Sequence, residues 1–240
     1  MQRPLAVLIA SLALVFAACG SDSPEAESTA TPEATTAATD TATPAPTTDA
    51  AAAPEGCDPA TVPGPKDVGK IKKPTEKLSA SKTYVAKVKT NCGEFEITLD
   101  AKRAPITGGS FKYLADKKFF DGLWFHRIEP GFVIQGGDPE GTGNGGPGYS
   151  VEEAPPSDLT YDKYIVAMAK TQTEPAGTSG SQFFVVTGDG AASLPPDYAL
   201  LGEVTKGQDV VDKIGAIEKD GQTGQPASAV VMESIEVTEK

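Results

Sequence analysis

The chain has 240 residues, which is enough for one large or two small domains. Its formal net charge is −12, with 33 acidic against 21 basic residues, and this acidic balance argues against a nucleic-acid-binding protein, which needs a basic footprint. The charge is unevenly spread, because residues 20–60 contain eight acidic residues and no basic one, whereas residues 61–90 contain eight lysines and two acidic residues. The average composition therefore hides segments of different character.

The first 18 residues have the pattern of a signal peptide. Arg3 supplies the positive end, and residues 5–16 supply an apolar core that is shorter than the roughly 20 residues of a membrane span. Phe16-Ala17-Ala18-Cys19 then resembles a bacterial lipobox, which implies cleavage before Cys19 and a thioether-linked diacylglycerol on its sulfur. This pattern predicts a lipid-anchored protein on the extracytoplasmic face of the cell membrane; an ordinary secretory signal with an incidental cysteine is the alternative.

Two further segments precede the main domain. Residues 19–54 are rich in Ala, Thr and Pro and lack aromatic residues, Val, Ile and Leu, so they are predicted to be a disordered tether. Residues 55–81 are a lysine-rich strap, which either attracts anionic lipid or wall polymers or is a solvated segment that wraps the domain. Export to an oxidising compartment favours a disulfide between Cys57 and Cys92 over two free thiols.

Residues 82–240 are predicted to form one domain. Alternating apolar and polar residues predict a hairpin of strands at 83–90 and 94–99, and Pro105 suits the first turn of a helix that runs to about Lys117. Short strands, two modest helices and many glycines together indicate a mainly β protein built as one antiparallel barrel. The remaining strands are predicted at 124–128, 132–135, 164–170, 182–187, 198–204 and 229–237, and the second helix at 206–217.

The glycine-rich stretch 141–146 formally matches the dinucleotide-binding pattern G-x-G-x-x-G. That pattern must open a helix within a βαβ unit, and here Pro147-Gly148-Tyr149 follows, so the stretch is predicted to be a long loop at the end of the barrel. One histidine and few cysteines argue against a zinc site. Neither a metal nor a cofactor is therefore expected.

Residues 124–138 are predicted to form the central hairpin of the domain, with strands at 124–128 and 132–135 joined by a turn at 129–131. The hairpin contains the only histidine, His126, next to Arg127. Because side chains alternate faces along a strand, Arg127 is expected to point away from His126.

On the return strand, the same alternation places Phe132 with Ile134 on one face and Val133 with Gln135 on the other. Hairpin twist and curvature can still gather Arg127, Phe132 and Gln135 around one concavity. One fixed cation, one amide and one aromatic ring suit a neutral amide substrate better than a phosphate or a metal.

This hairpin and a second block, residues 165–170 with 178–185, resemble the two active-site segments of the cyclophilin family of peptidyl-prolyl cis-trans isomerases. The likeness covers roughly residues 82–238. It implies a closed eight-stranded antiparallel β-barrel capped by two α-helices. It also implies an enzyme (EC 5.2.1.8) without a cofactor, proline-containing polypeptides as substrates, and a monomer.

The resemblance further implies roles for individual residues. Arg127 would be the catalytic donor, aimed at the proline nitrogen as the X–Pro bond twists. Gln135 would bind the substrate carbonyl and help to hold Arg127, and His126 would support the site from beside the arginine. The family often has Asn where Lys170 stands and His where Tyr198 stands, which alters the outer pocket. The other substrate-binding residues that the resemblance implies are Phe132, Val133, Ala169, Lys170, Gln182, Phe184, Leu194 and Tyr198.

These features together predict a membrane-tethered prolyl isomerase that assists the folding of exported proteins. A non-catalytic proline-peptide-binding module or holdase on the same barrel is the first alternative, and a structural lipoprotein of the cell envelope is the second. Proline isomerisation by the wild-type protein and by Arg127→Ala discriminates between them.

Overall fold

A computed structural model describes residues 53–240 of the chain. The signal peptide 1–18, Cys19 and nearly all of the tether 19–54 lie outside the described residues, so the predictions for them stay predictions. In the described part, no helix has the length and apolar character needed to cross a membrane. The elements in chain order are β1 (Tyr84–Thr90), β2 (Gly93–Leu99), α1 (Pro105–Asp116), β3 (Arg127–Glu129), β4 (Val133–Gly136), β5 (Val151–Glu152), β6 (Ile165–Met168), β7 (Thr178–Ser179), β8 (Phe183–Val186), a 3₁₀ turn (Asp189–Ala191), β9 (Leu200–Lys206), α2 (Gln208–Gly215) and β10 (Met232–Glu239).

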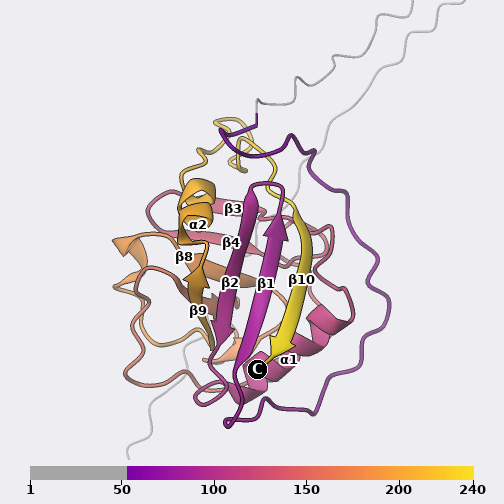
Figure 1. Cartoon of the computed structure of the whole chain (residues 1–240), viewed down its shortest axis with the longest axis vertical. Coiled ribbons are helices and arrows are strands. Elements are labelled where there is room, and N and C mark those ends of the chain that lie inside the picture. The colour runs from indigo at the N-terminus through magenta and orange to yellow at the C-terminus, as the bar shows by residue number, and fades with distance from the viewer. Residues whose placement is uncertain (1–52) are drawn as a thin grey trace, which may run out of the picture. The chain divides into compact units, whose positions relative to one another are not determined.

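Eight of the strands form one curled antiparallel sheet in the order β10-β1-β2-β9-β6-β8-β4-β3 (Figure 1). Its edge strands β3 and β10 do not pair with each other as strands. Just before each of these strands in the sequence, an isolated bridge joins Trp124 to Val231, and the amide of Phe125 donates to the carbonyl oxygen of Val230 at 2.9 Å. The mainly β fold with two helices is thus confirmed, whereas the prediction of a closed barrel is wrong.

The open edge follows from the length of β3. The strand predicted at 124–128 joins the sheet only from Arg127 onward, and Trp124 and Phe125, which approach Val231 and Val230, lie outside it. The sheet is therefore a half-barrel. The predicted first hairpin and both predicted helices are present, and their bounds lie within a few residues of those expected. The two-residue strands β5 and β7, which pair as a separate small sheet, were not predicted, since two residues carry no periodicity.

Side chains of the central strands alternate between two apolar layers. In β8, Phe183 and Val185 belong to the main core, whereas Phe184 and Val186 belong to a second, smaller cluster on the other face of the sheet. Both helices contribute buried residues to the main core, such as Phe111 of α1. The smaller cluster therefore lies on the face of the sheet that the helices leave open.

The lysine-rich strap, residues 55–81, runs beside β10 towards α1 without forming a helix or strand (Figure 1). Leu78 is buried in the main core. The ammonium of Lys66 donates hydrogen bonds to the carbonyl oxygens of Lys118, Phe119 and Asp121 at 2.8, 2.9 and 2.7 Å. These carbonyls belong to the turn that follows the end of α1, so the strap supplies a donor to backbone acceptors in that turn.

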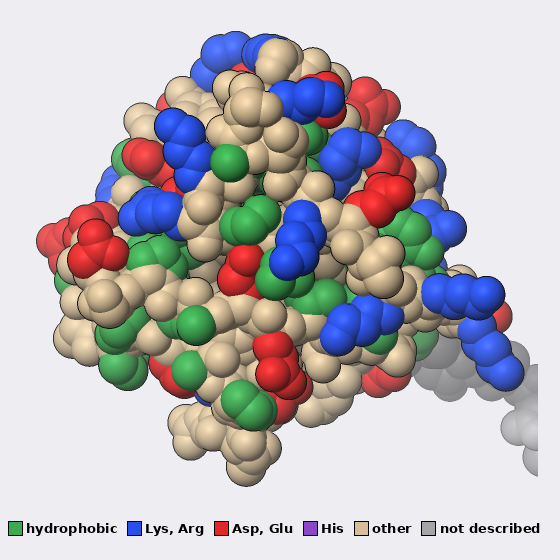
Figure 2. All heavy atoms as spheres, turned by 90° about the horizontal axis from the view of Figure 1, so that it is seen from below, with side chains coloured by type: hydrophobic (Ala, Val, Ile, Leu, Met, Phe, Trp, Pro, Cys, Tyr) green, Lys and Arg blue, Asp and Glu red, His purple; other side chains and the backbone are tan. Residues whose placement is uncertain are grey.

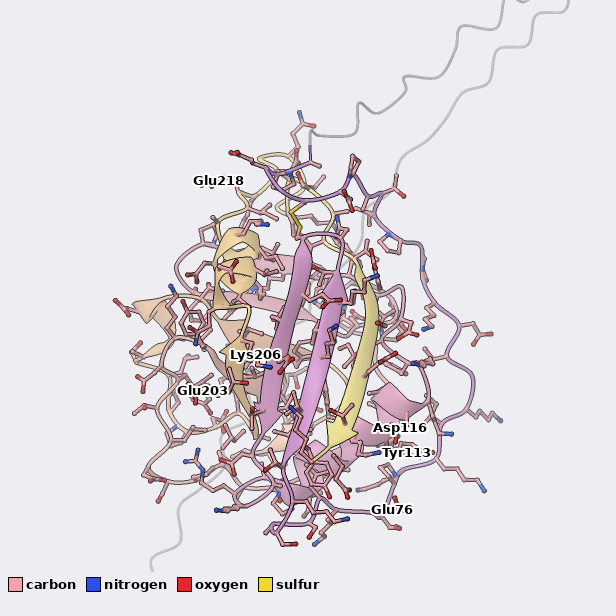
Figure 3. The ribbon with its side chains drawn as sticks, in the orientation of Figure 1. Glu76, Tyr113, Asp116, Glu203, Lys206 and Glu218 are labelled. Atoms are coloured by element: carbon pink, nitrogen blue, oxygen red, sulfur yellow. A yellow bond between two sulfur atoms is a disulfide. The ribbon has the colours of Figure 1, made fainter. Side chains whose placement is uncertain are left out.

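Two glycines in the middle of α1 make room for the strap. A Cβ on Gly109 would lie 2.5 Å from the carbonyl oxygen of Glu76, and a Cβ on Gly108 would lie 2.5 Å from Cδ1 of Leu78. Figure 3 labels Glu76 on the strap and Tyr113 and Asp116 on α1. Because glycine is unfavourable inside a helix, this pair is best explained by the close approach of the strap.

A disulfide joins Cys57 to Cys92, as predicted. It links the start of the strap to the turn between β1 and β2, and the amide of Asp58 donates to the carbonyl oxygen of Asn91 at 2.7 Å beside it. The two cysteines are 35 residues apart, and closing a loop of that size contributes about 4 kcal/mol in the chain-entropy model.

The lysines of β1 are neutralised across the sheet. Lys87 pairs with Glu94 at 2.6 Å, and Lys89 pairs with Glu233 at 2.8 Å. On the face shown in Figure 2, basic and acidic side chains are interspersed. The basic segment of the sequence is therefore balanced in part by acidic residues of neighbouring strands.

Candidate active site

One cross-strand row of residues builds the site. Arg127 of β3 lies opposite Gln135 of β4, Gln135 lies opposite Phe184 of β8, and Phe184 lies opposite Ala167 of β6. Directly opposed residues project from the same face of a sheet. The sheet register thus brings a guanidinium, an amide and an aromatic ring side by side, on the face that the helices leave open.

Arg127 is held on two sides. Its Nη1 donates to Oε1 of Gln135 at 3.3 Å, and its Nε lies 3.4 Å from Oε1 of Glu129. Its guanidinium carbon lies 5.6 Å from the centroid of the Phe132 ring. The side chain is 42% exposed, so the guanidinium is oriented by these contacts and still accessible to a ligand.

A chain of amide groups extends from the arginine to the glycine-rich loop. Nε2 of Gln135 donates to Oε1 of Gln182 at 3.0 Å, and Nε2 of Gln182 donates to the carbonyl oxygens of Gly143 and Gly145, each at 2.9 Å. These bonds fix which end of each amide faces which neighbour. Gln135 therefore directs its carbonyl oxygen to Arg127, and Gln182 orients it from the opposite side.

A pocket of about 310 Å³ opens beside the arginine. Phe184, Val133 and Phe132 supply apolar surface from the second cluster, and Ala169, which packs against the same cluster, also lines the pocket. A neighbouring cavity of about 570 Å³ shares Gln135 and Ala169 with it and continues past Gln182. The lining of the smaller pocket comprises Arg127, Phe132, Val133, Gln135, Ala169, Lys170, Thr171, Gln172, Phe184, Leu194 and Tyr198.

Most of the predicted site residues therefore meet in one place. Nine of them line the smaller pocket, and Gln182 lines the adjoining cavity and bonds to Gln135. The expectation that Phe132 shares a face with Ile134 is wrong, because Ile134 lies in the main core whereas Phe132 packs on the second cluster. Phe132 precedes β4 and belongs to the turn, so strand alternation does not apply to it.

His126 is near Arg127 in the chain but is not among the pocket-lining residues. It is only 8% exposed, and neither of its ring nitrogens has a hydrogen-bond partner in the described structure. Burial lowers the pKa of the imidazole; the carboxylate of Asp138 opposes this effect, and the charge of Arg127 adds to it. The buried ring thus lies outside the pocket lining but close enough to Arg127 to feel its charge, and its supporting role stays a prediction.

The aromatic wall of the pocket is ordered by hydrogen bonds. The rings of Tyr198 and Phe184 meet edge to face with centroids 5.5 Å apart. The hydroxyl of Tyr161 donates to the carbonyl oxygen of Tyr198 at 2.7 Å and accepts from its amide at 2.9 Å. Tyr161, which is fully buried, thereby sets the backbone position of Tyr198.

Several residues that shape the site were not predicted. The carboxylate of Asp138 accepts the amides of Glu140 and Thr142 at 2.8 and 3.0 Å, which orders the glycine-rich loop that holds Gln182. An aspartate followed within a few residues by glycines is a common loop-anchoring signal, and it was available in the sequence. Thr171 and Gln172, which line the pocket, lie in a loop without periodicity. Within residues 53–240, no group of three His, Cys, Asp or Glu residues is placed to hold a metal ion.

Comparison with known proteins identifies the family of the chain. The family described as "Cyclophilin type peptidyl-prolyl cis-trans isomerase/CLD" matches residues 85–237. Peptidyl-prolyl cis-trans isomerase A of Mycobacterium tuberculosis is 38% identical over 174 residues, which cover 65% of this chain and 93% of the relative. Peptidyl-prolyl cis-trans isomerase B of Bacillus subtilis is 43% identical over 115 residues, which cover 48% of this chain and 76% of the relative.

A solved structure gives the same result for the fold. The cyclophilin-type peptidyl-prolyl cis-trans isomerase of Cryptosporidium parvum, crystallised in the presence of the dipeptide Ala-Pro, has a TM-score of 0.58 and 28% sequence identity. The match covers 65% of this chain and 99% of that structure. From the curled sheet with two helices, the arginine-lined pocket and these likenesses, we conclude that the chain belongs to the cyclophilin-type peptidyl-prolyl cis-trans isomerases, EC 5.2.1.8.

Proposed function

We propose that the pocket beside Arg127 is where the X–Pro bond is isomerised, with Arg127 as the catalytic residue. We further propose that the enzyme is anchored by a lipid on Cys19 at the extracytoplasmic face of the cell membrane and assists the folding of exported proteins. The pocket-lining residues that the sequence singles out would bind the proline and its neighbours.

The chemistry needs little more than a well-placed donor. An X–Pro bond exchanges cis and trans slowly because rotation breaks amide resonance, at a barrier of about 20 kcal/mol. As the bond twists, the proline nitrogen becomes pyramidal and gains a usable lone pair. A donor aimed at that nitrogen stabilises the twisted state more than either planar state, and this difference lowers the barrier.

One observation carries the proposal: a guanidinium held by an amide lines a pocket together with the rings of Phe132, Phe184 and Tyr198. Arg127 contacts Gln135 and Glu129, and because arginine carries five N–H donors, these contacts leave others for a ligand. The ring of Phe184 offers an apolar wall of the kind that a proline ring requires. The Ala-Pro dipeptide named for the Cryptosporidium parvum structure supports a proline-containing ligand.

The test is a proline-peptide isomerisation assay on matched arginine variants. We expect Arg127→Ala to lower kcat/KM by a factor of about 10²–10³, as for loss of one electrostatic donor. Arg103→Ala is the control, because Arg103 also pairs with a nearby carboxylate, Asp100, but lies outside the pocket. Equal activity of Arg127→Ala and the wild type would refute the catalytic assignment.

The same assay addresses the holdase alternative. If the wild-type protein binds proline peptides without accelerating their isomerisation, the chain is a binding module in a family of enzymes. If the wild-type protein neither binds nor isomerises proline peptides, the result favours the alternative of a structural lipoprotein.

The proposed anchor rests on the apolar segment and the small residues before Cys19. Mass spectrometry of the mature N-terminal peptide is expected to show a diacylglycerol-modified Cys19. Cys19→Ala is expected to move the protein from the membrane fraction to the soluble one. An unmodified Cys19 in a membrane-free protein would overturn this part of the proposal and leave the isomerase assignment standing.

A further inference from the structure

Lys170 follows β6 and has an unusual setting for a lysine. Its side chain is only 3% exposed, whereas lysine is almost never buried unless it is paired. Its ammonium lies 2.6 Å from Oδ2 of Asp197. The chain thus buries a cation within the lining of the proposed proline pocket.

The ammonium of Lys170 makes three further contacts. It donates to the carbonyl oxygens of Thr171 at 3.2 Å and Glu174 at 3.1 Å. It also lies 5.6 Å from the centroid of the Tyr198 ring. One lysine therefore contacts both the loop 171–177 and the loop 192–199.

These two loops form one side of the pocket. Thr171 and Gln172 come from the first loop, and Leu194 and Tyr198 come from the second. A backbone hydrogen bond also links the two loops beside Lys170 and Asp197. The amide of Gly177 donates to the carbonyl oxygen of Asp197 at 2.8 Å.

We propose that Lys170, with Asp197, is a positioning pair that clamps these two loops together and so sets the shape of the part of the pocket that they line. The ammonium of Lys170 is saturated by protein acceptors, so it acts on the substrate through the wall and not by direct contact. Because loop ordering precedes binding, losing the clamp adds an ordering cost to substrate binding and changes KM more than kcat. This inference rests on the proposed function of the pocket.

The chain contains a matched control. Lys163 also pairs with an aspartate, Asp212, at 2.9 Å, and also lies over a tyrosine ring, that of Tyr164, at 4.9 Å. This second pair is about 40% exposed and lies outside the pocket lining. Lys170→Gln and Lys163→Gln therefore each remove an ion pair with an aspartate and a contact with a tyrosine ring, while Lys170→Gln also removes the two bonds to backbone carbonyls.

The kinetic test compares these two variants, together with Asp197→Asn, in the isomerisation assay. We expect Lys170→Gln and Asp197→Asn each to raise KM at least about fivefold while kcat changes less than about twofold. The double variant is expected to be no worse than the more affected single variant, because both act through one contact. Lys170→Arg is expected to recover part of the affinity, and Lys163→Gln is expected to match the wild type.

Amide hydrogen exchange gives a readout that does not depend on catalysis. The amides of Gly177 and Tyr198 are hydrogen-bonded at the two ends of the clamp. In Lys170→Gln their exchange is expected to accelerate about tenfold, while in Lys163→Gln it stays as in the wild type. If the wild-type protein isomerises nothing, the proposed function fails, and exchange alone still decides whether Lys170 clamps the loops.

Three results would overturn the proposal. The first is an unchanged KM in Lys170→Gln. The second is a fall in kcat without a change in KM, which would make Lys170 a catalytic residue. The third is unchanged exchange of both amides in a folded Lys170→Gln protein.

Discussion

His126 is the only histidine of the chain, and its buried setting makes folding sensitive to pH. Burial holds the pKa of the imidazole below its ordinary value of 6.5. Above that value the ring is neutral in both the folded and the unfolded chain. As the pH falls below it, the unfolded chain takes up a proton that the folded protein resists, so the free energy of unfolding decreases.

We therefore expect the wild-type protein to lose stability between pH 7 and pH 5.5, with a slope of at most about 1.4 kcal/mol per pH unit. Urea unfolding at several pH values measures this slope. His126→Gln keeps a polar side chain without a titrating group and is expected to flatten the curve in this range. An equal slope in both proteins would assign the effect to other groups.

Tyr161 illustrates how one buried hydroxyl supports the pocket. Burial raises the pKa of Tyr161 to about 12, so the hydroxyl stays protonated and can donate to Tyr198 at physiological pH. We expect Tyr161→Phe to cost about 1–3 kcal/mol in the free energy of unfolding, because the amide and carbonyl of Tyr198 lose their partner in a buried site.

Denaturant unfolding of Tyr161→Phe against Tyr113→Phe makes this comparison. The hydroxyl of Tyr113 makes no hydrogen bond within the described chain, so its loss is expected to change stability by less than about 0.5 kcal/mol. Similar losses of unfolding free energy in both variants would show that the hydrogen bonds of Tyr161 do not account for the destabilisation.

At the scale of elements, the contact between α1 and the strap reverses a usual helix rule. Replacing glycine by alanine inside a helix ordinarily stabilises it by up to about 1 kcal/mol. At Gly109 the added methyl group would meet the backbone of Glu76. We expect Gly109→Ala to destabilise the full chain by about 1–3 kcal/mol, as for overpacking of a closely packed contact.

The same substitution in a chain that begins at residue 80 provides the control. Without the strap the methyl group has space, and Gly109→Ala is expected to raise the melting temperature of that shortened protein relative to its own parent. If Gly109→Ala were neutral or stabilising in the full chain, the strap would not be what requires this glycine.

Sequence patterns among neighbouring residues predicted the helices and strands better than they predicted how the strands are arranged in the sheet. The hairpin of β1 and β2 and the helix after Pro105 follow from alternation and from a proline at the helix start, which are properties of neighbouring residues. The opening between β3 and β10 depends on how far residues 124–126 depart from the sheet. That departure is set by contacts with residues about 100 positions away, such as Val231. The pattern of neighbouring residues gives no information about such contacts.

At the scale of the whole molecule, the disulfide is a covalent cross-link between the start of the strap and the domain. We expect a Cys57→Ser, Cys92→Ser double variant to lose about 4 kcal/mol of unfolding free energy. Because neither cysteine lines the pocket, its kcat/KM under folding conditions is expected to remain near that of the wild type. Urea unfolding and the isomerisation assay measure the two quantities separately. A double variant that unfolds at the wild-type urea concentration would show that the remaining strap contacts hold it without the bond.

The candidate site shows the same division between local and long-range information. The pairing of Arg127 with Gln135 follows from a short hairpin and its register. Phe184, Leu194 and Tyr198 came from resemblance, because nothing near them in the chain indicates which strand they join. The burial of Lys170 against Asp197 could not be predicted, because it depends on two loops whose shapes that contact itself helps to determine.

The pairing of β1 with β10 also has a consequence for synthesis, because the two strands emerge at different times. Tyr84 at the start of β1 lies opposite Glu239 of β10, 155 positions further along the sequence. A chain that emerges from the ribosome N-terminus first exposes this strand long before its neighbour arrives. The nascent protein must therefore keep the edge of β1 that β10 will cover from aggregating until residues 232–239 have emerged.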